Sequence, residues 1–252
     1  MKGLDSLNDH LALFDKNRNE NKAAFTGDRK EYAEKIAKWF KPCAQWILAG
    51  HFEVKNTFNM AVREIYPTAI ELYYHEEVSE GFKDPIMYHT DDRKRQDHLR
   101  NPQHPDYFED RGIISLPYFP FGSLNPHASG IDITFENSEE KYRASFLIRG
   151  YKVKYAGKKE DKPVVNSTEI YDDMLIYGIP QNNCDWLNWV DGKQLEEHEI
   201  ETRGRRNVAE YVTDDKVPGL WNKNTAIEGK ESFTVGKNKF VKCPFQWQFR
   251  RK

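Results

Sequence analysis

Apolar residues recur at helical spacing in the first fifty residues of the chain. A short first helix is expected near Ser6 to Phe14, and a polar, turn-rich stretch from Asp15 to Asp28 follows it. Asp28 then provides an N-cap for a second helix, with Glu31 three residues later as in a capping box. The apolar positions of this second helix are Tyr32, Ile36, Trp39 and Phe40. Pro42 is expected to end it.

After Gly50, apolar and polar residues alternate, which is the period of a half-buried strand. HFEVKNTF and AIELYYH have this alternation and predict two strands. Three further β-like segments follow: GIISLPYF, GIDITF from Gly130, and RASFLIRGYKVKY from Arg143 to Tyr155. The turn-like ENSEEK between the last two predicts that they pair as an antiparallel hairpin.

The rest of the chain is less regular. The charged stretch from Glu76 to Pro105 predicts long loops, Ser167 is a possible cap for a helix that reaches Gly178, and KFVKCPFQWQFRRK predicts a last strand with a basic tail. The expected class is therefore α+β, a mostly antiparallel, curved β-sheet or barrel with packed helices. We expect residues 1–28 to form an N-terminal helical extension and residues 29–252 a single domain.

Composition adds an excess of aromatic side chains, with 6 Trp, 13 Tyr and 15 Phe in 252 residues. Rings are expected to supply much of the core and to leave some for a pocket or a recognition surface. The chain has no long apolar run and no secretory signal at its start, so we expect a cytoplasmic protein without a membrane partner. Three scattered cysteines predict neither a disulfide framework nor a zinc knuckle. A net charge of −2 predicts no global attraction to nucleic acid.

The first candidate for chemistry is the pair Glu71 and Tyr73, which alternation places on one face of a strand. A carboxylate beside a ring can activate water next to a stacked planar substrate, although a glutamate on a strand is more often solvated. Arg149 ends an apolar strand just before a glycine. In a buried setting it needs a carboxylate, a phosphate or a π-face as partner, and a structural salt bridge and a functional contact explain it equally well.

Histidines supply a second group of candidates. His89 ends the segment DPIMYH, and His127 precedes Asp132 in NPHASGIDITF. His-x-Ser before an apolar run is half of a paired-histidine phosphoesterase pattern, and the second half is missing. A metal site is another interpretation of His89, Asp91, Asp92, His98, His104 and His127, whose spacings match no standard zinc or hydrolase motif. A metal-dependent phosphoesterase would use His89, Asp91, His127 and Asp132.

Basic residues clustered near aromatic rings are the third group. Such clusters are usually solvated surface, but they can also contact phosphates. The candidate nucleic-acid rim consists of Arg93, Arg95, Phe121, Arg205, Trp247 and Arg250.

In their order along the chain these motifs resemble the alkyladenine (3-methyladenine) DNA glycosylase family. AEKIAKWF resembles the helix of that family that ends in a hydrophobic pair, and ELY with Glu71 resembles its Glu-x-Tyr strand. DPIMYH, ending at His89, is similar to an Asp-Pro-x-x-His-like element. GIDI with Asp132 and LIRG with Arg149 are similar to two later strands, and MLIYGI and PFQWQF to two elements near the end. The resemblance spans most of residues 30 to 250.

The resemblance implies a DNA-repair hydrolase with a glycosylase-like fold, which acts as a monomer without cofactor or metal. Such an enzyme flips a damaged nucleotide into a pocket and hydrolyses its N-glycosidic bond. Glu71 is then the base that deprotonates the attacking water, and Arg149 holds the water, the carboxylate or a phosphate. Tyr73 and His89 contact the flipped base, and His127 and Asp132 are further base-binding candidates.

Two departures from the family pattern concern the site itself. The family has Asn where this chain has Asp132, and its intercalating Tyr falls on Asn125 here, with Phe121 or Leu124 as substitutes. Two alternatives therefore stay open. One is a non-catalytic protein that binds a nucleobase or nucleotide, and the other is a metal-dependent phosphoesterase that uses the His and Asp residues.

Overall fold

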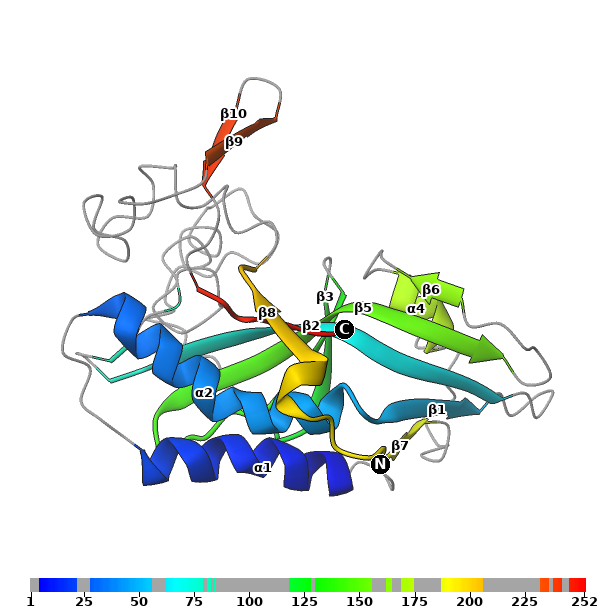
Figure 1. Cartoon of the computed structure of the whole chain (residues 1–252). Helices are drawn as coiled ribbons and strands as arrows, with labels where there is room; N and C mark the ends of the chain where they lie inside the picture. Colours follow the sequence, from blue (N-terminus) through cyan, green and yellow to red (C-terminus); the bar gives the residue numbers. More distant parts are fainter. Residues whose placement is uncertain are drawn as a thin grey trace, which may run out of the picture.

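The computed structural model describes thirteen separate stretches of the chain. They are residues 5–21, 28–55, 62–78, 81–82, 84, 118–127, 130–155, 162–164, 169–174, 187–205, 232–235, 238–241 and 245–252. In this part of the chain two long helices lie along one side of a curved antiparallel sheet that forms half a barrel (Figure 1). The expected α+β class with a curved, mostly antiparallel sheet is confirmed.

The helices are α1 (Asp5–Glu20), α2 (Arg29–Ile47), the short α4 (Ile170–Asp173) and a 3-10 turn, η3 (Glu197–Glu199). The strands are β1 (His51–Lys55), β2 (Val62–Glu76), β3 (Ser123–His127), β4 (Gly130–Thr134), β5 (Tyr142–Tyr155), β6 (Lys162–Val164), β7 (Leu187–Val190), β8 (Ile200–Arg203), β9 (Ser232–Val235), β10 (Asn238–Val241) and β11 (Gln248–Arg251).

The two longest strands, β2 and β5, pair over nearly their whole length and form the spine of the sheet. On one side of this spine, β2 pairs with β1 near its start and with β11 at its middle. On the other side, β5 pairs with β4 near its start and with β6 near its end. The sheet thus branches at the middle of the spine. Strand β7 extends the sheet beyond β1, β3 extends it beyond β4, and β8 extends it beyond β11.

Helix α1 is longer than the sequence predicts, because it continues past Phe14 through residues that predict a polar turn. Two polar residues of its second half are bonded to the sheet. Asp15 accepts a hydrogen bond from the hydroxyl of Tyr142 at 2.9 Å, and the buried Arg18 donates from Nε to the hydroxyl of Tyr74 at 2.8 Å. These long-range bonds allow a polar segment to remain helical against the core.

Helix α2 begins where the sequence predicts, and the Asp28 side chain accepts a hydrogen bond from the Glu31 backbone N–H at 3.0 Å. It does not end at Pro42 but continues to Ile47. A proline inside a helix removes one backbone hydrogen bond. The turn beyond it buries Cys43, Ala44 and Ile47, and this apolar burial offsets the lost bond.

The predicted hairpin of β4 and β5 and the two strands predicted after Gly50 are confirmed. The C-terminal segment contains two strands, β10 and β11, rather than one. Most of GIISLPYF and of the predicted loops after Glu76 lies outside the described residues. Of the helix predicted from Ser167, the structure describes only α4 and Met174.

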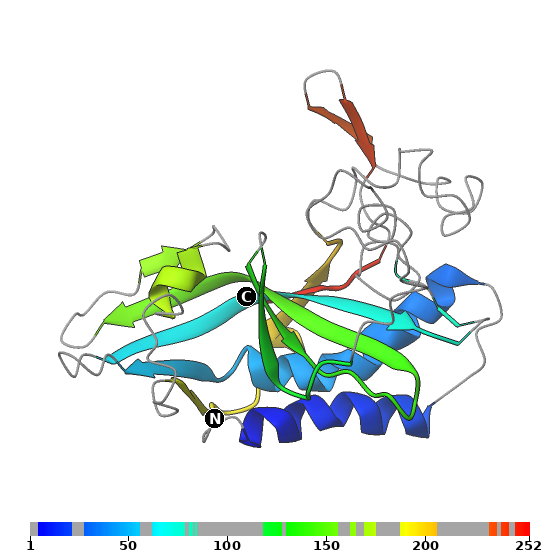
Figure 2. The same cartoon turned by 180° about the vertical axis from the view of Figure 1, so that it is seen from behind.

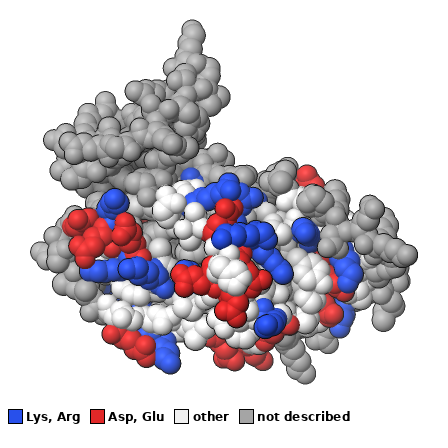
Figure 3. Space-filling view, in the orientation of Figure 1, with Lys and Arg blue, Asp and Glu red and all other residues white. Residues whose placement is uncertain are grey.

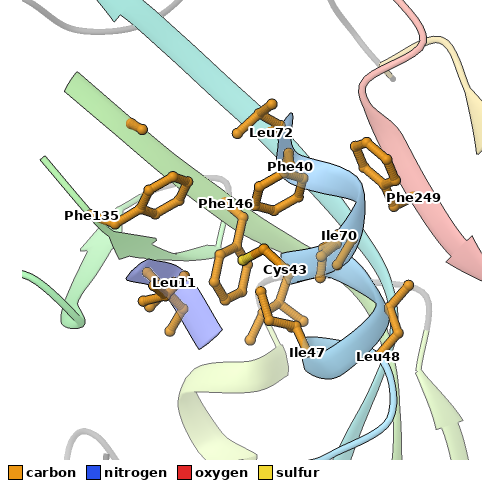
Figure 4. Close-up of a cluster of buried hydrophobic side chains, with 14 of the residues drawn as sticks. Leu11, Phe40, Cys43, Ile47, Leu48, Ile70, Leu72, Phe135, Phe146 and Phe249 are labelled. Carbon is orange, nitrogen blue, oxygen red and sulfur yellow. The ribbon is translucent and has the colours of Figure 1, made fainter. Parts of the chain in front are cut away.

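The apolar core fills the space between the helices and one face of the sheet. Views from both sides show α1 and α2 on the same side of it (Figures 1 and 2). Side chains of α1 and α2 meet those of β2, β5 and β11 there, among them Leu11, Phe40, Ile70, Phe146 and Phe249 (Figure 4). Rings dominate, as the composition predicts, and Phe14 alone packs edge-on against five other rings.

Candidate functional site

The sheet face turned away from the helices is polar along the second half of the spine. On β2, Ile70 and Leu72 belong to the core, and Glu71 and Tyr73 alternate with them. The strand register places Asp132 of β4, Leu147 of β5, Glu71 of β2 and Gln248 of β11 directly opposite one another, in that order. Residues directly opposite in a sheet project from the same face. We call these four residues the cross-strand row.

Glu71 is the centre of a tight hydrogen-bonded group. Its Oε2 accepts from Arg149 Nε at 2.6 Å and from the Tyr73 hydroxyl at 3.1 Å. Its Oε1 accepts from Gln248 Nε2 at 2.9 Å. Arg149 also donates from Nη2 to the Tyr73 hydroxyl at 3.2 Å. Glu71, Tyr73, Arg149 and Gln248 are called the Glu71 site below.

Arg149 reaches this group because the spine is irregular at its midpoint. Ala69 pairs with Gly150, but Ile70 pairs with Ile148, so Arg149 is an extra residue in β5. Such a bulge bends the strand and re-aims a side chain, and bulges occur often beside functional sites. This bulge separates two parts of β5. The part up to Leu147 pairs with β4, and the part from Tyr151 onward pairs with β6.

A second ion pair borders the site. Arg205 and Asp84 are fully buried and bonded twice, with Nη1 donating to Oδ2 at 2.7 Å and Nη2 to Oδ1 at 3.1 Å. The Arg205 guanidinium also lies 4.9 Å from the centre of the Tyr73 ring and 4.8 Å from that of the Trp247 ring. Asp84 thus anchors a cation between two rings, one of which belongs to the Glu71 site.

The pKa values in the site follow from burial and from the charges of neighbouring side chains. The pKa of the Tyr73 hydroxyl is raised well above its usual range, mainly by burial and then by the charge of Glu71, with a smaller contribution from Asp132. Burial on its own lowers the pKa of Arg149, but Tyr73 and Glu71 outweigh that effect and the net shift is upward. Tyr73 is therefore a neutral hydroxyl and Arg149 a fixed cation at neutral pH.

Exposure separates the members of the site into two groups. The Glu71 side chain is 0% exposed and Gln248 is buried, whereas Arg149 keeps 13% of its side chain exposed. Tyr73 and Asp132 are half-buried. The partly exposed residues of the site are thus Tyr73, Arg149 and Asp132, and the buried Glu71 bonds the first two of them.

Of the predicted catalytic and base-binding residues, the structure brings Glu71, Tyr73 and Arg149 into direct contact and places Asp132 in the same row. His89 lies outside the described residues. His127 is at the end of β3, and its side chain is not described.

The rim residues do not share one surface. Arg93 and Arg95 lie outside the described residues. Arg205 and Trp247 are buried rather than exposed, because Arg205 pairs with Asp84 and the Trp247 indole N–H donates to a backbone carbonyl of α2 at 2.9 Å. Phe121 is half-buried against the core.

Among the rim residues that the structure describes, Arg250 is the one whose charge reaches the surface, and it lies 3.8 Å from Glu201. On the face of the molecule seen in Figure 3, basic and acidic side chains are interspersed over the described surface. The described residues of the predicted rim therefore do not form a continuous basic surface of the kind that contacts phosphates.

Gln248 and Asp84 are site residues that the sequence does not single out. Gln248 precedes Phe249 in QWQF, where alternation predicts that it faces away from the core. Asp84 begins the DPIMYH segment, in which only the histidine attracts notice. Their partners lie 177 and 121 residues away, so no local pattern reveals them.

Comparison with known proteins does not assign the chain to a family. No family model, curated protein or solved structure matches the chain. The resemblance to the alkyladenine glycosylases stays a prediction. No helix in the described part of the chain has the length and apolar character needed to cross a membrane. No group of three or more His, Cys, Asp or Glu side chains suited to a metal ion occurs among the described residues.

Proposed function

We propose that the protein binds a nucleobase-containing ligand at the Glu71 site. The observation that carries this proposal is that Glu71 is fully enclosed and bonded to Arg149 at 2.6 Å, while Arg149 and Tyr73 keep part of their surface exposed. Glu71 thereby serves as a fixed anchor for the guanidinium. The groups left to meet a ligand are suited to recognition by stacking and hydrogen bonding.

A nucleobase matches these groups because it is planar and carries donors and acceptors along its edges. The Tyr73 ring offers an aromatic surface, Arg149 offers N–H donors, and Asp132 offers an acceptor when ionised. Ligand sites combine apolar or aromatic walls with a few fixed polar groups, and perturbed pKa values such as those of Tyr73 and Arg149 concentrate at such sites. The small net charge of −2 agrees better with a small ligand than with a long polyanion.

The experiment is a calorimetric titration of the full chain with each of the four ribonucleoside monophosphates. We expect at least one to bind, and we expect Tyr73→Phe and Arg149→Lys to weaken that binding about tenfold or more, because each removes a hydrogen bond of the Glu71 site. Lys154→Ala is the matched control, since it removes a cation from the same strand at a position that is 46% exposed. It is expected to bind as the unmodified protein does.

Two results would contradict the proposal. One is the absence of binding for all four nucleotides at millimolar concentration by a protein that circular dichroism shows to be folded. The other is equal weakening by the control and by the Glu71-site variants, because this would mean a general effect of charge or stability.

The second candidate is base excision with Glu71 as the water-activating base, in the glycosylase-like fold that the resemblance implies. Its support is that Arg149 is in contact with both Glu71 and Tyr73, which the resemblance places in a different motif. It requires a rearrangement that frees an oxygen of Glu71 and admits water. Release of free base from an alkylated-purine duplex, lost in Glu71→Gln, would favour it, whereas ligand binding without any abasic product favours the binding function.

A further inference from the structure

The ring of Tyr73 is held at its tip by other members of the Glu71 site. Its hydroxyl donates to Glu71 Oε2 at 3.1 Å and accepts from Arg149 Nη2 at 3.2 Å. The hydroxyl oxygen of a tyrosine lies on the axis about which the ring rotates, and the energy of this rotation varies only broadly with angle. Hydrogen bonds to the hydroxyl therefore fix where the ring ends, but they do not fix the direction in which its two faces point.

The direction of the ring faces is set by Arg205. Its guanidinium lies over the Tyr73 ring, 4.9 Å from the ring centre, and 4.8 Å from the centre of the Trp247 ring. The Arg205 and Asp84 side chains are both 0% exposed and are joined by a bidentate contact. A guanidinium in such a fork has a fixed orientation. One face of Tyr73 is therefore covered by a fixed cation, and a ligand can stack only on the other face.

The same ion pair also holds the backbone of β2 on both sides of Tyr73. Strand β11 pairs with β2 only as far as residue 71. Beyond this point the Leu72 carbonyl accepts from Arg205 Nη1 at 3.2 Å, and the Tyr74 N–H donates to Asp84 Oδ2 at 3.2 Å. Asp84 and Arg205 thus bond backbone groups that a neighbouring strand would otherwise pair with.

We propose that Asp84 and Arg205 are positioning residues of the Glu71 site, which orient the Tyr73 ring so that its remaining face can stack on the base of the ligand. The inference rests on the proposed function and adds two residues that act through Tyr73. A buried ion pair adds little net stability, whereas a binding site needs side chains whose orientation is locked by the residues behind them. Because Arg205 lies against both rings, the base stacks on Tyr73 alone and is not enclosed between Tyr73 and Trp247.

The test is a double-mutant cycle, measured by calorimetry on the full chain with the ribonucleoside monophosphate that binds most tightly. Asp84→Asn is expected to weaken binding about tenfold, because Arg205 loses the charge that holds it. The same effect is expected in a Tyr73→Phe background, which keeps the ring. In a Tyr73→Leu background, which has no ring to orient, Asp84→Asn is expected to change the dissociation constant by less than about twofold.

Two further measurements keep the test decisive. Arg205→Lys keeps the cation but not the fork, and it is expected to give the same pattern if Asp84→Asn fails to fold. If Tyr73→Leu binds too weakly for calorimetry, the ring-proton resonances of Tyr73 are followed by NMR at saturating nucleotide. A base stacked on the ring shifts these resonances, and we expect the shift in Asp84→Asn to be about half or less of that in the unmodified protein.

Glu136→Gln is the matched control, because it also removes the charge of a buried carboxylate bonded to a buried guanidinium, that of Arg143 at 2.9 Å. It is expected to leave nucleotide binding unchanged. Three results overturn the positioning role and leave nucleobase binding standing: an unchanged affinity in Asp84→Asn, a loss of affinity that persists in Tyr73→Leu, or the same loss in Glu136→Gln. Absence of binding of all four nucleotides to the unmodified protein overturns the proposed function itself.

Discussion

At the scale of single residues, the site depends on a buried ion pair between the two spine strands. A buried pair adds little net stability compared with an apolar pair, but removing one partner leaves an uncompensated charge. Glu71 and Arg149 are such a pair, and their side chains are 0% and 13% exposed. Glu64 and Lys154 form a second pair between the same strands at 2.9 Å, with side chains 26% and 46% exposed. The same two strands thus hold one buried and one exposed ion pair, whose contributions to stability can be compared.

We predict that Arg149→Ala lowers the free energy of unfolding by about 3–5 kcal/mol, because Glu71 is then buried without its cation. Lys154→Ala, which removes the exposed cation, is predicted to cost at most about 1 kcal/mol. Urea unfolding followed by circular dichroism measures both. Equal losses of unfolding free energy in the two variants would contradict the prediction that burial makes an unpaired Glu71 costly.

At the scale of elements, a third group of charges joins the segment before β3 to the sheet. Glu136 follows β4, and its Oε2 accepts from the Phe119 backbone N–H at 2.7 Å and from Arg143 Nη1 at 2.9 Å. Arg143 also donates from Nε to Glu77 at 2.6 Å and lies over the Tyr118 ring. Two carboxylates therefore share one guanidinium in a buried position.

This arrangement predicts a pH dependence of stability. Burial raises the pKa of Glu136 from 4.5 to about 7, the nearby charge of Glu77 adds to the rise, and the bonds from Phe119 and Arg143 oppose it without cancelling it. Below pH 4.5 the folded and unfolded chains both hold this proton. Between that value and about pH 7 only the folded chain holds it, so the contribution of Glu136 to stability falls as the pH rises through this window and is constant above it.

Glu136→Gln is therefore expected to reduce the loss of unfolding free energy between pH 4.5 and 7.5 by about 2–3 kcal/mol, since one pKa unit corresponds to about 1.4 kcal/mol. Urea titrations at several pH values measure the difference. Glu139→Gln, at an exposed position in the same turn, is the matched control and should follow the unmodified protein. A Glu136→Gln curve parallel to that of the unmodified protein would contradict the assignment.

At the scale of the whole molecule, the sequence predicts what depends on local period. Alternation locates β1, β2, β4 and β5, and the hairpin follows from a short turn. The predictions are wrong where contacts with residues distant in the sequence override local preferences. Arg18 keeps α1 helical because Tyr74, 56 residues away, accepts its hydrogen bond, and α2 continues beyond Pro42 because the core covers its last turn.

The site divides in the same way. Glu71 and Tyr73 are predicted together because residues two apart on a strand share a face. The contact with Arg149 requires the register of β2 and β5 and the bulge beside Gly150, and the contact with Gln248 requires the pairing of β11 with β2. Register across strands depends on the packed sheet, so residue types and spacing do not specify it.

The most direct test of nucleobase binding at the Glu71 site is to follow the arginine Nε–H resonances by NMR during titrations with each of the four ribonucleoside monophosphates. Both Arg149 and Arg18 have an Nε–H held in a hydrogen bond. Arg149 lies on the sheet face turned away from the helices, and Arg18 lies in α1 and bonds to Tyr74 of β2. Saturable movement of the Arg149 resonance, with the Arg18 resonance unchanged, is the predicted result. An Arg149 resonance that stays in place with all four nucleotides at millimolar concentration, or one that moves together with that of Arg18, would contradict binding at this site.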